Sequence, residues 1–107
     1  MRDRMRTWTD PDGHGFRLEM YDSGRSRGGK WEVDYEFFHS GDLIFTGTLG
    51  CSPLHAIDSD ETVQGILCFC SLRPGDTDAA YFSDYTPAQL AWASRWGEAL
   101  SVYSCAG

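Results

Sequence analysis

The most regular segment of the chain is Trp31-Glu-Val-Asp-Tyr-Glu-Phe37, in which aromatic or aliphatic residues alternate with acidic ones. Alternation with a period of two is typical of a β-strand that has one buried and one solvent-facing side. The segment His39-Ser-Gly-Asp42 follows, and its glycine predicts a tight hairpin turn because glycine adopts positive φ at little cost. Residues 43–49 are therefore expected to return as the next strand.

Two more strands are predicted before this hairpin. Residues 16–21 alternate between apolar and polar side chains, and residues 6–9 form a shorter run of the same kind. Between them, residues 10–15 are rich in Asp, Gly and Pro, which is typical of a turn. Residues 23–29 are rich in Gly, Arg and Ser and are predicted to form a loop. The N-terminal half is thus expected to be an antiparallel meander of three or four strands.

The C-terminal half predicts two helices. Apolar residues of the first helix recur at helical spacing at Val63, Ile66, Leu67 and Cys70. The segment Thr86-Pro-Ala-Gln89 offers an N-cap, a proline at the first helical position and a capping box, so a second helix is expected from there to about Tyr103. Strands followed by helices favour one α+β domain over residues 1–107, with the two C-terminal helices packed on the meander.

Charge is distributed unevenly along the chain. Residues 1–30 carry seven Lys and Arg against five Asp and Glu, residues 31–107 carry two against eleven, and the formal net charge is −7. Such a surface repels nucleic acid and anionic membranes and attracts basic protein surfaces. The sequence has no apolar run near the ~18 residues of a membrane span and no secretory signal pattern. We therefore expect a cytoplasmic protein that binds neither membrane nor nucleic acid directly.

The strand at residues 31–37 is expected to present a row of acids. If its aromatic and aliphatic residues face the core, Glu32, Asp34 and Glu36 face solvent at intervals of about 6.6 Å. Asp42 on the hairpin and Asp58, Asp60 and Glu61 at the start of the first helix are candidates to extend this acidic surface. Tyr21 and Phe38 are predicted to point outward on the same side, where an aromatic ring among acids is typical of an interface anchor.

These residues favour a non-enzymatic interaction protein. It would bind a basic surface of a partner, such as the groove of a nucleic-acid-binding protein, and inhibit that partner by covering the groove. Small size and acidic charge are also typical of phage-encoded inhibitors of host defence systems. The simpler alternative is that the acids only solvate the wet side of the strand, paired with Arg17 and Lys30.

Two other hypotheses remain open. A metal-binding protein or metal-dependent hydrolase would use His55, Asp58, Asp60 and Glu61, because imidazole and carboxylate groups ligate divalent cations. A helix N-terminus accounts for the same acids without a metal. A homo-oligomeric structural module would instead use the outward aromatics as a self-interface.

The cysteines are expected to be reduced thiols, because no secretory signal precedes them. Cys51 and Cys105 would have to join His55 in space to form a zinc site, and no paired Cys-x-x-Cys motif supports one. Cys68 and Cys70 diverge by about 200° on a helix, so they are not expected to share a metal. No nucleophile or phosphate-loop motif is present, and the sequence predicts neither an enzyme nor a cofactor.

Overall fold

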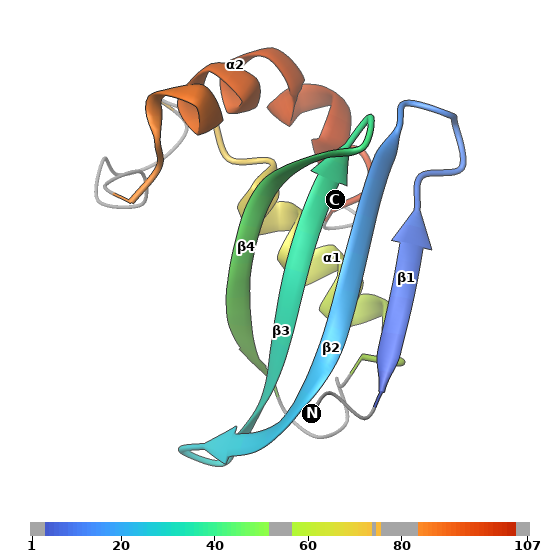
Figure 1. The fold of residues 1–107 in the computed structure, drawn as a ribbon, viewed down its shortest axis with the longest axis vertical. Helices are drawn as coiled ribbons and strands as arrows, with labels where there is room; N and C mark the ends of the chain where they lie inside the picture. The colour runs from blue at the N-terminus through green and yellow to red at the C-terminus, as the bar shows by residue number, and fades with distance from the viewer. Residues whose placement is uncertain (1–3, 52–56, 74, 76–83, 105–107) are drawn as a thin grey trace.

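The computed structural model describes residues 4–51, 57–73, 75 and 84–104, and it has the predicted α+β architecture (Figure 1). Its elements are β1 (Met5–Thr9), β2 (Phe16–Arg27), β3 (Lys30–His39), β4 (Asp42–Cys51), α1 (Asp60–Cys70) and α2 (Pro87–Ser101). The strands form one sheet in the order β1-β2-β3-β4, and each neighbouring pair is antiparallel. The predicted meander is therefore confirmed, with four strands.

Two tight turns connect the three longest strands. Ser40 and Gly41 link β3 to β4 with φ angles of 52° and 88°, and Gly28 and Gly29 link β2 to β3 with φ angles of 57° and 79°. Positive φ at both central residues is typical of a type I′ turn, whose twist matches that of paired strands. The hairpin predicted at His39-Ser-Gly-Asp42 is confirmed.

The prediction of a loop over residues 23–29 is wrong. β2 continues to Arg27, and its register against β3 shifts between Asp22 and Ser26. Gly24 has a φ of 73°, and its N–H donates to the Asp22 carboxylate at 2.9 Å. Glycine and serine here mark a β-bulge within a long strand, because a bulge needs a residue that tolerates the left-handed conformation.

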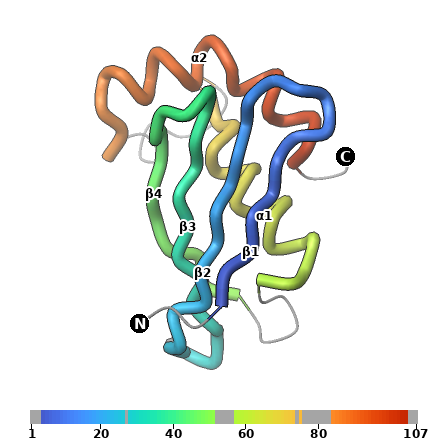
Figure 2. Tube along the Cα trace, turned by 45° about the vertical axis from the view of Figure 1, so that its right-hand side comes forward, coloured from blue at the N-terminus to red at the C-terminus, as the bar shows by residue number. Residues whose placement is uncertain are grey.

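Both helices lie on one face of the sheet (Figure 1, Figure 2). α1 runs behind the strands, and α2 crosses the end of the sheet where the β3–β4 turn lies. Alternate strand residues point toward the helices. With the apolar residues of the C-terminal half they form the core, namely Phe16, Leu18, Met20, Val33, Phe37, Phe45, Ile57, Val63, Ile66, Leu67, Cys70 and Leu100. Burial of this layer determines which side of each strand remains outside.

Side-chain caps begin both helices. Ser59 Oγ accepts the Glu61 N–H at the start of α1. Thr86 and Gln89 form the predicted capping box of α2. Gln89 also donates through Nε2 to the Ile44 carbonyl at 2.8 Å, which ties the start of α2 to β4. Within the described residues, no helix is long and apolar enough to cross a membrane.

The aromatic and aliphatic residues of segment 31–37 pack into the core as expected, except Trp31. Phe37 is fully buried, and Tyr35, Trp92 and Trp96 pack against the core. Trp31 lies outside this cluster, and its Nε1 donates to the Asp22 carboxylate at 2.6 Å. The bulge in β2 turns Asp22 toward Trp31, so the indole ring has a polar partner near the start of β3.

Three cysteines carry free thiols in the described part of the chain, Cys51, Cys68 and Cys70. Cys70 is buried in the core as predicted, and burial raises the pKa of its thiol. It therefore packs as a neutral apolar group. Cys105 lies outside the described residues.

Candidate functional site

The open face of the sheet is the face turned away from α1 and α2 (Figure 1). Its side chains come from strand positions that alternate with the buried ones. They are Met5, Thr7, Thr9, Arg17, Glu19, Tyr21, Lys30, Glu32, Asp34, Glu36, Phe38, Leu43, Thr46 and Thr48. The structure thus brings together, on one surface, the predicted binding residues Tyr21, Glu32, Asp34, Glu36 and Phe38.

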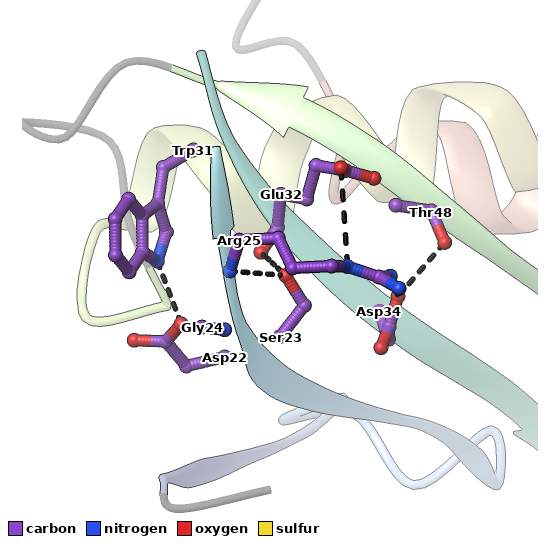
Figure 3. Close-up of polar contacts among 8 residues, drawn as sticks. All are labelled: Asp22, Ser23, Gly24, Arg25, Trp31, Glu32, Asp34 and Thr48. Atoms are coloured by element: carbon purple, nitrogen blue, oxygen red, sulfur yellow. Dashed lines mark hydrogen bonds and ion pairs between the residues drawn. The ribbon is translucent and has the colours of Figure 1, made fainter. Parts of the chain in front are cut away.

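Arg25 lies over the acidic row of β3 (Figure 3). Its Nε is 4.0 Å from the Glu32 carboxylate, and its Nη2 is 3.7 Å from the Asp34 carboxylate. The Thr48 hydroxyl donates to Asp34 at 2.8 Å. The side chains of Glu32 and Asp34 are therefore only 21% and 22% exposed, whereas Arg25 is 64% exposed. The alternation of residues alone predicts acids that are more exposed to solvent. It does not show that Arg25, from the bulged end of β2, covers Glu32 and Asp34.

Glu19 and Glu36 stand directly opposite each other on β2 and β3. The Tyr21 hydroxyl lies between them, 2.9 Å from Glu19 and 3.0 Å from Glu36. A hydroxyl has one proton, so it donates to one of these carboxylates at a time. Burial, together with hydrogen bonds to both carboxylates and their charge, raises the pKa of Tyr21 to about 12. The centre of the open face is therefore a pair of like charges that share one donor.

Arg17 and Phe38 face each other across β2 and β3. The guanidinium carbon of Arg17 lies 4.3 Å from the centre of the Phe38 ring, within the range of a cation–π contact. Arg17 Nε is also 3.7 Å from the Glu19 carboxylate. Arg17 therefore pairs with Glu19 and not with the acids of β3, and Lys30 has no ion pair among the described residues.

The remaining predicted acids lie away from this row. Asp58 pairs with Arg4, and Asp60 pairs with Arg6 at 2.8 Å. Arg6 also donates to the Ile57 carbonyl at 3.1 Å, on the side of β1 that faces α1. Glu61 occupies the first turn of α1, and Asp42 begins β4 opposite His39. The structure therefore separates Asp58, Asp60 and Glu61 from the open face, and it gives Asp58 and Asp60 arginine partners of their own.

The alternative metal site has little geometric support. His55 lies outside the described residues. Across the described ranges, no group of three or more His, Cys, Asp or Glu side chains is placed to hold a metal ion. The carboxylates of Asp58 and Asp60 already face guanidinium groups, which compete with a cation for the same oxygens.

Comparison with known proteins gives no assignment. No protein-family model, curated protein or solved structure matches this chain. The proposals below therefore depend on the geometry and the electrostatics of the chain itself.

Two contributors to the open face are missing from the residues that the sequence indicates, Glu19 and Arg25. If the pairing of Ser26 with Trp31 continued without a shift, Glu19 would stand opposite Phe38, but the bulge brings it opposite Glu36. Arg25 belongs to the segment predicted as a loop. A bulge predicted at Gly24 would have indicated both residues. A Gly-Ser-rich composition alone does not distinguish a bulge from a loop.

Proposed function

We propose that this protein binds a basic surface of another protein through the open face of its sheet, and that it acts by covering that surface. The observation that carries the proposal is the Glu19–Glu36 pair, two opposed carboxylates that share the Tyr21 proton. Glu36 has no ion pair in the described part of the chain. Like charges opposite each other destabilise a strand pair, and a partner's guanidinium or ammonium group would relieve that repulsion.

Two arginines of the chain support a preference of this face for guanidinium groups. Arg25 contacts the carboxylates of Glu32 and Asp34, and Arg17 stacks on Phe38. Ion pairing and ring stacking are the two ways in which a surface of acids and aromatics recognises arginine. Basic side chains of a partner would use the same contacts and would compete with Arg25.

The charge of the whole chain favours the same kind of partner. The formal net charge is −7, and among the described residues the open face carries four carboxylates against the guanidinium groups of Arg17 and Arg25 and the ammonium group of Lys30. Such a field attracts a basic protein and speeds its association, and salt weakens the effect. A nucleic-acid-binding groove is one surface with the required charge. Binding there would exclude the nucleic acid sterically and would need no catalytic group.

A matched pair of variants tests the proposal. Glu32→Gln with Glu36→Gln removes two negative charges from the open face, and Glu61→Gln with Glu98→Gln removes two negative charges from the two helices. The probe is a fluorescein-labelled nona-arginine peptide, with its affinity measured by anisotropy at low salt. An exposed ion pair contributes about 0.2–1 kcal/mol. The first variant should therefore bind the probe about 2- to 30-fold more weakly, and the second should stay within about twofold of the wild type.

Removal of Arg25 gives the opposite effect. Arg25→Gln frees Glu32 and Asp34, so the probe should bind more tightly by about 1.4- to 5-fold. Arg95→Gln is the control, because it removes the same positive charge from α2, where Arg95 lies over Trp96. Equal effects of the two arginine variants, or of the two glutamate variants, would mean that net charge alone governs binding and would contradict the open face as the binding surface.

A further inference from the structure

β4 is an edge strand, and no other strand pairs with its outer side in the described part of the chain. Natural edge strands use charged residues and prolines to avoid pairing with other chains. Residues 45–51 contain no charged residue and no proline. The opposite edge, β1, has five residues and lies beside the ion pairs of Arg4 and Arg6. Long, uncharged β4 is thus the edge at which another strand could add.

A cavity of about 150 Å³ opens beside β4 on its helix side. Four aromatic side chains line it, Tyr35, Phe45, Phe69 and Tyr85, and Asp84 is the charged residue among its described neighbours. The Tyr85 ring lies 5.2 Å from the Phe45 ring, and its hydroxyl donates to the Phe69 carbonyl at 3.1 Å. Small-molecule sites usually exceed about 300 Å³, so this cavity suits one side chain.

The charge and the walls of this cavity favour a cationic side chain. Tyrosine hydroxyls are neutral near pH 7, and burial raises the pKa of both Tyr35 and Tyr85 further. Asp84 is exposed and has no ion pair among the described residues. An ammonium or guanidinium group against aromatic rings gains a cation–π contact, and the nearby carboxylate would add an ion pair.

A second hollow, of about 350 Å³, lies on the open-face side of the same part of β4. Asp34 and Glu36 line it together with Thr46 and Thr48. Successive side chains of a β-strand point to opposite faces of a sheet. A strand paired with residues 45–48 would therefore direct one side chain toward the aromatic cavity and the next toward this acidic hollow.

We infer that an extended segment of the basic partner adds to the sheet as a fifth strand beside β4 and places two consecutive Arg or Lys side chains in these two sites. Main-chain hydrogen bonds to β4 would supply affinity, and the two sites would select basic residues. The basic character of the partner rests on the proposed function. Strand addition along β4 is a separate claim about how that partner is held.

The test uses the full chain and a defined peptide, Ac-Thr-Val-Arg-Arg-Val-Thr-NH2. The matched control is the same peptide with alternate backbone nitrogens methylated, which keeps the charge but removes hydrogen-bond donors. We expect the first peptide to slow amide hydrogen exchange at residues 45–49 and to bind at least about tenfold more tightly than the control. Asp84→Asn should weaken its binding by about 1.4- to 5-fold, and Glu98→Gln, which removes the same charge from α2, should weaken it less than Asp84→Asn does.

Several outcomes would overturn the inference. Equal affinity for the methylated peptide, or unchanged exchange in β4, would exclude strand addition. Protection of β4 in the free protein, together with a dimeric mass in sedimentation, would mean that a second copy of the chain occupies the edge. Weaker nona-arginine binding by the Glu32/Glu36 variant, without peptide protection of β4, would refute this inference alone. Protection of β4 with nona-arginine binding unaffected in that variant would refute the open-face proposal alone.

Discussion

Substitution of Gly97 by alanine sets two effects of known size against each other. In an isolated helix the change would stabilise by about 1 kcal/mol, because alanine has the higher helix propensity. In this fold, a Cβ on Gly97 would lie 2.7 Å from the Ser71 carbonyl oxygen and 2.6 Å from Arg73 Cγ. Ser71 is the C-cap of α1, and its N–H donates to the Leu67 carbonyl at 2.9 Å. The oxygen is therefore held in place, and α2 has to move away from α1.

Overpacking of this kind costs about 1–3 kcal/mol, so we expect Gly97→Ala to lower the free energy of unfolding by up to about 2 kcal/mol. Gly65→Ala is the matched control in α1, since its Cβ would meet Leu49 at 3.7 Å, an ordinary contact. That variant should be more stable than the wild type by up to about 1 kcal/mol. Urea unfolding followed by tryptophan fluorescence measures both changes. A Gly97→Ala protein as stable as the Gly65→Ala protein would refute the close approach of α2 to the end of α1.

Three further predictions concern pH and helix capping. Asp10→Ala should destabilise by about 1–2 kcal/mol, because the Asp10 carboxylate accepts three backbone N–H groups of the β1–β2 turn. Burial raises the pKa of Asp10, but these hydrogen bonds hold that pKa below the ordinary 3.8. The wild type should therefore lose the stability contributed by the Asp10 carboxylate as the pH falls through the lowered pKa. Urea titrations between pH 2 and 5 should show this loss in the wild type and not in the variant. The pKa of Tyr21 is raised from 10.0 to about 12, so its neutral form stabilises the fold fully below pH 10 and progressively less up to pH 12, and Tyr21→Phe should flatten the measured stability over that interval. Thr86→Ala should lower the free energy of unfolding by about 1 kcal/mol, because the N-cap is lost. Gln89→Ala should lower it by up to about 3 kcal/mol, because this variant also loses the hydrogen bond to the Ile44 carbonyl. Equal melting temperatures of these two variants would contradict the tie between α2 and β4.

Local patterns were sufficient to predict the order and type of the elements, but not the continuation of β2 to Arg27. The alternation of residues 31–37 and the Ser40–Gly41 turn predicted the β3–β4 hairpin, and Thr86-Pro-Ala-Gln89 predicted the start of α2. These signals act within a few residues, so no tertiary information is needed to read them. Burial of alternate strand residues also placed Tyr21, Glu32 and Phe38 on one face.

The environment of the candidate site was not predictable in the same way. Asp58 and Arg4 are 54 positions apart in the sequence, and so are Asp60 and Arg6, so no local pattern links them. The opposition of Glu19 and Glu36 depends on a bulge at Gly24, which changes the register of β2 against β3. The aromatic cavity joins Tyr35 of β3 to Tyr85 ahead of α2. Such contacts follow from packing of distant segments, which a single sequence does not specify.

The most direct test of the binding surface is to locate a basic ligand on the folded protein. Nona-arginine would be titrated into the isotope-labelled full chain, and amide and side-chain shifts would be followed by NMR. We predict that the largest changes fall on open-face residues of β2 and β3, above all Glu19, Tyr21, Asp34 and Glu36. The largest changes at Asp58, Asp60 and Glu61 by the start of α1, or changes spread evenly over all acids, would contradict the account.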